Sequence, residues 1–410
     1  MATPTRSRFE IFASTALGLE SIAAGELKSL GIRGKQEVGG VSFAADMAAA
    51  YRANLWLRTA SRVLIRLGRF HASTFYELER RSKKLPWTDF LPAAGAVAVR
   101  ATCRKSKLYH SDAVAERVLA AIARVSPPGV RAEPATVETD DAAEEDRPDE
   151  KSSAQLFVVR IVHDEVEISA DSSGALLHRR GYRTEVARAP LRETLAAAML
   201  LASGWKKNEP LLDPLCGSGT IPIEAALLAR GIPPGLSRDF QFMTWPGFDN
   251  KEWDAIVSDA RQSVANPVLD IRGSDRDAGA IEAAGRNAAR AGVSDCVAFS
   301  TESISAALDR LAGSKPAGGW ILTNPPYGIR VGEERHLRDL YSTLAVATAR
   351  HPGWRLGALT ADPALAGQLG VPVRSRFDSR NGGIPVSFVV SEKPKRAPKR
   401  AVDSEHEERQ

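Results

Sequence analysis

A short apolar strand that passes through a glycine-rich turn directly into a helix most constrains the fold of this chain. The apolar pair Leu211 and Leu212 precedes Asp213-Pro-Leu-Cys-Gly-Ser-Gly-Thr220, and a helical pattern follows from Ile223 to Ala229. A strand, a glycine turn and a helix start in this order place backbone N–H groups beside a nucleotide-like ligand. An ordinary strand-to-helix turn can have the same composition, so this run alone does not establish a ligand site.

A second short run predicts a loop that can bind a planar amine. Asn324-Pro325-Pro326-Tyr327 follows the apolar residues Trp320 to Leu322, at the carboxyl end of a predicted strand, where open α/β sheets bind ligands. Proline restricts the backbone and has no N–H, so the loop presents the Asn324 side chain and a backbone carbonyl as acceptors. With the flat ring of Tyr327 beside them, these groups suit an exocyclic amine on a planar ring, although a rigid surface turn would also use Asn and Pro.

An aromatic amine of this kind, such as N2 of guanine, is a poor nucleophile because its lone pair is delocalised into the ring. Two acceptors for its N–H bonds, with in-line placement against a sulfonium methyl group, would help where charge shifts in the transition state. Such a direct transfer needs no metal and no covalent intermediate. Cys216, inside the glycine turn, is therefore not expected to act as a nucleophile.

The spacing of an acidic residue supports a nucleotide-type ligand. Sites of this kind place a carboxylate about 20 residues after the glycine turn, where it holds ribose hydroxyls. Asp275 lies 62 residues after Asp213, but the 40 residues of 231–270 are rich in Pro, Trp and Phe and indicate an insertion, which leaves a spacing of 22. Asp275 is therefore the ribose candidate. Asp277 is the runner-up, with the N-cap of a helix at Ala278–Ala291 as its other expected role.

Together these motifs resemble those of the THUMP-domain class I RNA methyltransferases that use S-adenosylmethionine. Within that family, the chain is similar to the bacterial branch that methylates guanine N2 in large-subunit ribosomal RNA. The resemblance covers residues 5 to about 390. It includes four further runs that are more specific than a glycine turn, namely Ser106-Lys-Leu-Tyr-His110, His178-Arg-Arg-Gly-Tyr-Arg183, Ala189-Pro-Leu-Arg-Glu-Thr194 and Trp245-Pro-Gly-Phe-Asp249.

The resemblance implies a role for each matching residue. The cofactor, S-adenosyl-L-methionine, would be bound by Asp213, Pro214, Cys216, Gly217, Gly219, Thr220, Asp275 and Glu302, the last on the adenine side. The guanine would be held by Asn324, Pro325, Pro326 and Tyr327. The ring face of Tyr327, rather than its hydroxyl, would stack on the base. RNA would be contacted by Lys105, Lys107, Tyr109, His110, Arg179, Arg180 and Arg183, although the three arginines could instead pack at a domain boundary.

The implied fold class is α/β, with a Rossmann-like class I methyltransferase domain after an N-terminal α+β region that binds RNA. The expected parts are a ferredoxin-like piece at 1–44, a THUMP domain at 45–170, a linker at 171–190, the methyltransferase domain at 191–391 with the insertion 231–270, and a disordered tail at 392–410. Independently, strand and helix patterns alternate from residue 191 onward and predict a mainly parallel sheet. Its last strands are expected at Leu356–Thr360 and Val386–Val390.

The net charge of +5 hides an uneven distribution of charge. Residues 1–125 contain 20 Lys and Arg against 10 Asp and Glu, whereas residues 126–155 contain 3 against 9. The acidic stretch lacks apolar periodicity and indicates a solvated loop. A basic N-terminal half accompanied by the Ser106–His110 run favours contact with RNA phosphates over a merely solvated charged face.

Composition also limits where the protein acts. There is no apolar run of about 18 residues and no signal peptide pattern at the start. The three cysteines, Cys103, Cys216 and Cys296, show neither a metal-ligand nor a disulfide spacing. We therefore expect a cytoplasmic protein that binds RNA, without a membrane or metal partner.

Several functions stay open at this stage. The preferred one is guanine-N2 methylation of 23S rRNA or its assembly intermediate. The alternatives are the same reaction on tRNA, amino methylation of DNA adenine or of a protein glutamine, and a non-catalytic RNA-binding assembly factor. The basic N-terminal half favours RNA, and the intact set of Asp213, Gly217, Gly219 and Asn324 favours an enzyme. Methylation of a pyrimidine C5 is disfavoured because residues 318–334 contain no cysteine nucleophile.

Overall fold

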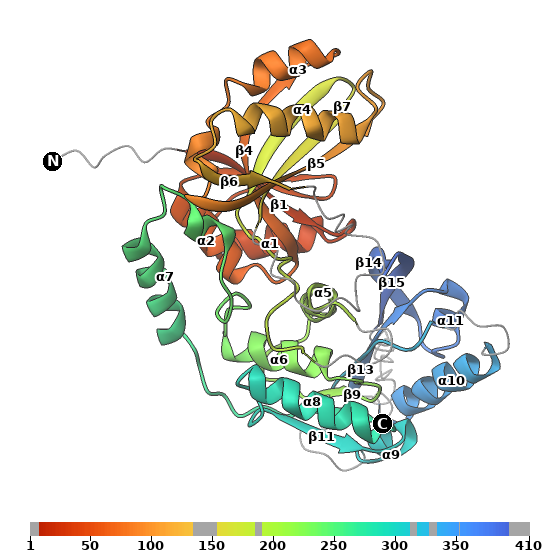
Figure 1. The fold of residues 1–410 in the computed structure, drawn as a ribbon. Coiled ribbons are helices and arrows are strands. Elements are labelled where there is room, and N and C mark those ends of the chain that lie inside the picture. The colour runs from red at the N-terminus through yellow and green to blue at the C-terminus, as the bar shows by residue number, and fades with distance from the viewer. Residues whose placement is uncertain are drawn as a thin grey trace, which may run out of the picture.

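The chain forms two bodies, each built on one β-sheet, as a computed structural model shows (Figure 1). The structure describes residues 8–133, 154–184, 191–311, 318–327, 334–351 and 353–392. Most of the acidic stretch and nearly all of the expected tail at 392–410 lie outside these ranges. None of the helices in these ranges is both long and apolar enough to cross a membrane.

The N-terminal body contains one continuous sheet, in the order β2-β3-β1-β4-β8-β7-β5-β6. Its strands are β1 (Phe9–Thr15), β2 (Lys35–Glu37), β3 (Gly40–Ala45), β4 (Ala60–His71), β5 (Ala94–Arg104), β6 (Gly129–Ala132), β7 (Ala154–Val162) and β8 (Glu165–Asp171). Its helices are α1 (Glu20–Ser29), α2 (Met47–Trp56), α3 (Phe75–Ser82), η1 (Trp87–Phe90) and α4 (Ser111–Ala123). Because β4 pairs with β1 on one side and with β8 on the other, the regions expected to be a ferredoxin-like piece and a THUMP domain share this sheet. The division expected between residues 44 and 45 falls inside β3.

The C-terminal body contains a second sheet, in the order β11-β10-β9-β12-β13-β15-β14. Its strands are β9 (Leu211–Asp213), β10 (Ile271–Asp275), β11 (Val297–Thr301), β12 (Gly319–Thr323), β13 (Trp354–Thr360), β14 (Val373–Asn381) and β15 (Ile384–Ser391). Its helices are α5 (Glu193–Ser203), α6 (Thr220–Arg230), α8 (Ala278–Arg290), α9 (Ile304–Asp309), α10 (Glu334–Arg350) and α11 (Pro363–Gly367). The strands β9 to β13 pair in parallel, and β15 runs antiparallel to both of its neighbours.

Hydrophobic side chains cover both faces of this second sheet. Successive strand residues point to opposite faces. Accordingly, Leu211 and Trp320 belong to one apolar cluster, with α5 and α6, whereas Leu212 and Ile321 belong to another, with α10. A parallel sheet buried on both faces needs such continuous apolar strands.

The order of the strands positions the candidate site. β9 lies between β10 and β12, so the chain leaves β9 toward one edge of the sheet and returns to build the other. The carboxyl ends of β9 and β12 therefore border the crevice where open α/β sheets bind ligands. This topological switch point brings the glycine turn and the Asn324–Tyr327 loop together.

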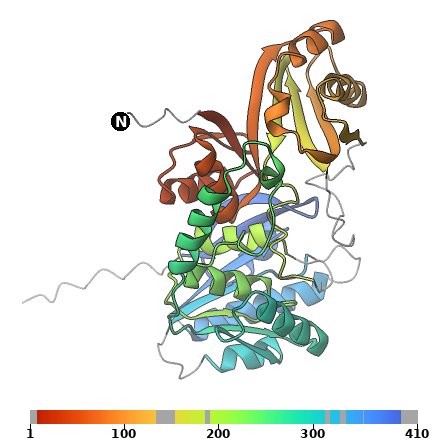
Figure 2. The same cartoon turned by 60° about the vertical axis from the view of Figure 1, so that its left-hand side comes forward.

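The segment 231–270, which the sequence predicts to be an insertion, begins and ends in the C-terminal body and packs against the N-terminal body. It contains η2 (Gln241–Thr244) and α7 (Asn250–Gln262), and in Figure 1 α7 lies beside α2 at the left. Phe242 is completely buried in the core of the N-terminal body, where its ring stacks on Tyr51 with 4.4 Å between centroids. Trp253 of α7 packs edge-on to Tyr51 as well. The turned view in Figure 2 shows α7 running alongside both bodies.

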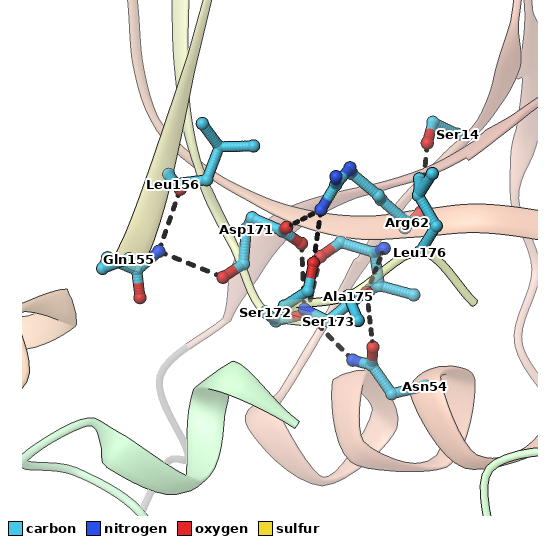
Figure 3. Close-up of polar contacts among 12 residues, drawn as sticks. Ser14, Asn54, Arg62, Gln155, Leu156, Asp171, Ser172, Ser173, Ala175 and Leu176 are labelled. Carbon is cyan, nitrogen blue, oxygen red and sulfur yellow. Dashed lines mark hydrogen bonds and ion pairs between the residues drawn. The ribbon is translucent and has the colours of Figure 1, made fainter. Parts of the chain in front are cut away.

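Buried polar contacts fix the segment that leaves the N-terminal sheet (Figure 3). Asp171, at the end of β8, forms an ion pair with Arg62 of β4. The Ser173 hydroxyl donates to Asn54 Oδ1 at 2.7 Å, which ties the segment to α2. Gln155 Nε2 donates to the Asp171 carbonyl at 3.1 Å. Because each of these buried groups has a partner, the segment that follows β8 leaves the N-terminal sheet in a defined direction.

Candidate active site

The glycine turn after β9 is held tightly against β10. Gly217 and Gly219 have φ angles of 52° and 86°, in the left-handed region that favours glycine. The Gly217 N–H donates to Asp275 Oδ2 at 3.0 Å. A Cβ at position 219 would lie only 3.0 Å from the Phe299 ring and from the Ala284 Cβ, so any other residue would displace these neighbours.

Three further residues predicted for the cofactor line the inner side of this turn. Pro214, Cys216 and Thr220 are all buried. Burial raises the pKa of the Cys216 thiol well above its ordinary value, and the nearby Asp213 raises it further. The thiol therefore stays protonated, which fits a packing role rather than a nucleophile.

Asp213, at the end of β9, has a carboxyl group whose pKa lies near neutral pH. Only 2% of the residue is exposed, and its Oδ1 accepts a hydrogen bond from the Leu215 N–H at 3.1 Å. Burial raises the pKa of Asp213 to about 7, while the hydrogen bond from the Leu215 N–H opposes the rise and Asp275 adds to it. A cation placed nearby would favour the ionised form.

Asp275 and Asp277 have different surroundings. Asp277 Oδ1 accepts from the N–H groups of Gly279 at 2.9 Å and Ala280 at 3.3 Å, as an N-cap of α8. Asp275 instead lies at the end of β10 and contacts the turn through Gly217, with its other oxygen accepting from the Asp277 N–H at 3.1 Å. Each carboxylate oxygen can accept more than one hydrogen bond. Asp275 is therefore the better placed of the two to bind a ligand in the turn.

Glu302 follows the third adjacent strand, β11. Its N–H donates to the Asp275 carbonyl at 3.0 Å. Its carboxylate pairs with Arg310 at 3.0 Å and accepts the Ser300 hydroxyl. Asp213, Asp275 and Glu302 therefore lie at the carboxyl ends of three neighbouring strands, on one edge of the crevice.

The Asn324–Tyr327 loop follows β12, next to β9. The Tyr327 hydroxyl donates to Asn324 Oδ1 at 2.6 Å and accepts from Asn381 Nδ2 at 3.3 Å. The Tyr327 side chain packs against the apolar core, Pro325 is buried and Pro326 is exposed. The hydroxyl of Tyr327 therefore has a structural role in the loop that the sequence interpretation, which used only the ring face, did not include.

Four of the residues expected to contact RNA lie on one exposed loop between β5 and α4. Lys105, Lys107, Tyr109 and His110 are all exposed, and 69% of Tyr109 is accessible. The rings of Tyr109 and His110 lie 4.1 Å apart, and the Lys107 N–H donates to Asp164 Oδ1 at 2.7 Å. The loop is thus held on the β7–β8 turn while its cationic and aromatic side chains face outward.

The three arginines of the His178–Arg183 run are placed differently from this loop. Arg180 is only 4% exposed and pairs with the fully buried Glu224 of α6 at 3.4 Å. Arg183 pairs with buried Glu193 at 3.1 Å, and Arg179 is half-buried. The expectation of a phosphate contact at Arg180 is therefore corrected. Its charge is neutralised inside the boundary between the bodies, where an unpaired partner would be costly.

Two polar residues at the site have no role in the sequence interpretation. Thr323 lies beside Asp213, and Asn381 contacts Tyr327 from the end of β14. The sequence carries a signal for the second, because Asn381-Gly-Gly383 between two strand-like segments is typical of a tight hairpin turn. Thr323 resembles any small residue at the end of a buried strand and has no such signal.

The fold and the site define a class I methyltransferase, with a ligand turn after the central strand and one antiparallel strand near the sheet edge. The chain belongs to the family of RMKL-like methyltransferases, because the model described as "RMKL-like, methyltransferase domain" matches residues 180–386. The model described as "RlmL ferredoxin-like domain" matches residues 10–64.

Similar proteins extend over nearly the whole chain. The ribosomal RNA large subunit methyltransferase K/L of Syntrophotalea carbinolica is 37% identical over 385 residues, which are 92% of this chain and 52% of that protein. The chain thus spans about half the length of that relative. The putative RNA methyltransferase slr0064 of Synechocystis is 34% identical, over 93% of this chain and 96% of that protein. The solved structure of SMU.472, a putative methyltransferase complexed with SAH, has 29% identity and a TM-score of 0.81, over 95% of this chain and 100% of that one.

The cofactor of this class is S-adenosyl-L-methionine, and the residues around the turn fit it. Glycines at 217 and 219 let a ligand approach the backbone closely. The buried carboxyl group of Asp213 suits a positively charged ligand, and the partly exposed carboxylate of Asp275 suits hydroxyl groups.

Proposed function

We propose that this protein transfers a methyl group from S-adenosylmethionine to the exocyclic N2 of a guanine in RNA, and that the RNA is 23S rRNA. The observation that carries the proposal is the position of Asn324. Its side-chain oxygen, in a loop that also contains Tyr327, follows the strand next to the glycine turn. Hydrogen-bond acceptors beside the glycine turn favour an amine as the group that receives the methyl group.

On the donor side, the bound cofactor supplies a methyl group on a positively charged sulfur. Asp275 holds the ribose hydroxyls, and Glu302 contacts the adenine side. The carboxyl group of Asp213, with its pKa of about 7, becomes ionised when the positive charge is present. These roles use the carboxylates at the ends of β9, β10 and β11.

On the acceptor side, Asn324 accepts a hydrogen bond from the guanine amine. An amide oxygen has two lone pairs, so Oδ1 can bind the amine while it also accepts the Tyr327 hydroxyl. The Pro325 carbonyl accepts the second N–H of the amine, and the Tyr327 ring stacks on a base turned out of its helix. Transfer would be direct: the N–CH3 bond forms as the sulfonium S–CH3 bond breaks, the cofactor leaves as the neutral thioether, and the amine releases one proton to solvent. The Cys216 thiol, which burial keeps protonated, takes no part in this step.

RNA is supported as the substrate by two features. The exposed loop with Lys105, Lys107, Tyr109 and His110 combines positive charge with flat rings, as proteins that bind RNA phosphates and bases do. The two relatives described above are named as RNA methyltransferases, one of them for the large ribosomal subunit.

The variant Asn324→Ala tests the proposed acceptor. Under single-turnover conditions with labelled S-adenosylmethionine and 23S rRNA transcribed in vitro, it should lower the rate by roughly two to three orders of magnitude. Calorimetry should show cofactor affinity near that of the wild type, because the proposed contact of the Asn324 amide is with the guanine amine and not with the cofactor. The exposed Asn208, changed to Ala, is the control and should remain fully active. A normal rate in Asn324→Ala would rule out this mechanism.

A further inference from the structure

We propose that Asn381 is a positioning residue for methyl transfer, which holds Tyr327 and, through Tyr327, the acceptor oxygen of Asn324. This inference rests on the proposed function, because it assumes that Asn324 contacts the amine that receives the methyl group.

Two hydrogen bonds run from Asn381 through Tyr327 to Asn324, each donated toward Asn324. Asn381 Nδ2 donates to the Tyr327 hydroxyl oxygen at 3.3 Å. Tyr327 in turn donates its hydroxyl proton to Asn324 Oδ1 at 2.6 Å. Since the amide of Asn381 can only donate through Nδ2, its bond leaves the hydroxyl proton free to point at Asn324. The orientation of Asn324 therefore depends on a residue 57 positions later in the chain.

Asn381 belongs to a rigid part of the sheet. It is the last residue of β14 and pairs with Ile384 of β15 across a two-residue turn. Gly382 and Gly383 form this turn with φ angles of 55° and 81°, as a type I′ turn requires. β15 is bonded in turn to β13, so the hairpin extends the main sheet.

The loop that Asn381 supports is, by contrast, outside any helix or strand. Residues 324–327 follow β12 without forming regular structure. Side chains on such a loop keep a precise orientation only when other groups fix them, and a strand residue fixes them more firmly than another loop would. The contact from β14 supplies this support at Tyr327.

Stability alone does not explain an asparagine at this position. Asn381 is only 5% exposed, and its Oδ1 has no hydrogen-bond partner within the part of the chain that the structure describes. A buried acceptor without a partner lowers stability, and an apolar side chain of similar size would avoid that loss. Phe377, also buried on β14, shows that this strand accommodates an apolar side chain, which packs against Phe388. An apolar residue at position 381 could not donate the hydrogen bond to the Tyr327 hydroxyl.

A double-mutant cycle tests whether Asn381 acts through the Tyr327 hydroxyl. The variants are Asn381→Ala, Tyr327→Phe and the two combined, assayed with labelled S-adenosylmethionine and 23S rRNA transcribed in vitro. Each single change should lower kcat about tenfold, with the RNA KM and the cofactor Kd within about twofold of the wild type. The double variant should be no slower than Tyr327→Phe alone, because both changes break the same connection.

Two further variants separate positioning from folding. Asn381→Leu keeps the size of the side chain but removes the donor, so its Tm should equal or exceed that of the wild type while kcat falls as in Asn381→Ala. Ser379→Ala is the matched control, because Ser379 lies two residues earlier on β14, is 8% exposed and has a hydroxyl without a partner in the described ranges. Its kcat should stay within about twofold of the wild type.

Each other outcome has a defined meaning. Additive losses in the double variant, full turnover in Asn381→Leu, or an equal loss in Ser379→Ala would overturn the positioning role. If the wild type methylates a tRNA transcript or an adenine in DNA instead of 23S rRNA, the proposed substrate is wrong, and the same cycle on that substrate decides the role of Asn381. If it methylates none of them, the proposed function and this inference both fail.

Discussion

The two carboxylate oxygens of Asp275 accept hydrogen bonds from the backbone of Gly217 and of Asp277. The side chain therefore joins the glycine turn to the start of α8, and it remains partly exposed toward the crevice. Asp277 has its carboxylate engaged at the helix cap. Spacing in the sequence leads to Asp275 but leaves Asp277 as an alternative, and the hydrogen bonds of the folded chain favour the first.

Two asparagine substitutions distinguish these carboxylates. If Asp275 holds the ribose as proposed, Asp275→Asn removes the charge that strengthens its hydrogen bonds from the hydroxyls, each on the order of 1.5 to 3 kcal/mol, so cofactor Kd should rise at least about tenfold. Asp277→Asn keeps a good helix cap and should change Kd less than about twofold. Isothermal titration calorimetry of both variants provides the measurement. A larger effect in Asp277→Asn would exchange the two assignments.

At the scale of elements, the chemistry depends on where strands end. β9 ends at Asp213, and burial raises the pKa of its carboxyl group to about 7. A carboxyl group in this state is neutral in acid and ionised in mild base. Its charge should therefore couple the binding of a cationic cofactor to pH.

The prediction for Asp213 has two readouts. Cofactor affinity should increase from about pH 6 to about pH 8 in the wild type, because the positive ligand favours the ionised carboxylate, and should stay nearly level in Asp213→Asn. Without ligand, the raised pKa means that the folded protein holds the Asp213 proton more tightly than the unfolded chain does. The contribution of this proton to the free energy of unfolding is complete below about pH 4 and is lost as pH rises toward 7. Asp213→Asn should thus gain Tm relative to the wild type over that range. Calorimetric titrations showing a level wild-type affinity would contradict this role.

The elements that the sequence did not predict have physical explanations. β14 was not expected, because its buried positions are Phe377, Ser379 and Asn381, with a single large apolar side chain to mark the alternation. Composition predicts an insertion at 231–270, but it gives no information on how this segment packs. Phe242 finds its aromatic partner at Tyr51, nearly two hundred residues earlier, and local patterns carry no information on such a contact. The strands around the two motifs were predictable because they are short, continuously apolar and followed by turn residues.

At the scale of the whole molecule, the exposed basic loop and the catalytic crevice lie on different bodies. Buried contacts at Arg180 and Glu224, and the aromatic packing of the insertion, join these bodies. RNA contacts on the first body would therefore be held in a fixed relation to the crevice of the second. The basic character of the first 125 residues was visible in the sequence, but the burial of Arg180 required the folded chain.

A pair of charge-matched variants tests the loop as the RNA contact. Lys105→Ala with Lys107→Ala in the full chain should weaken binding to 23S rRNA transcripts and reduce the slope of log K against log salt by about 1 to 2. The same charge is removed from the other body by Lys206→Ala with Lys207→Ala, both exposed, and this control should bind nearly as well as the wild type. Fluorescence anisotropy at several salt concentrations gives both quantities. Equal losses in the two double variants would indicate a non-specific effect of net charge.

The identity of the methylated nucleoside tests the central claim most directly. Unmodified 23S rRNA is incubated with the protein and labelled S-adenosylmethionine in a single turnover, and the RNA is then digested to nucleosides for mass spectrometry. If Asn324, Pro325 and Tyr327 hold a guanine amine as proposed, the labelled product is N2-methylguanosine. Label recovered as N6-methyladenosine would contradict the account.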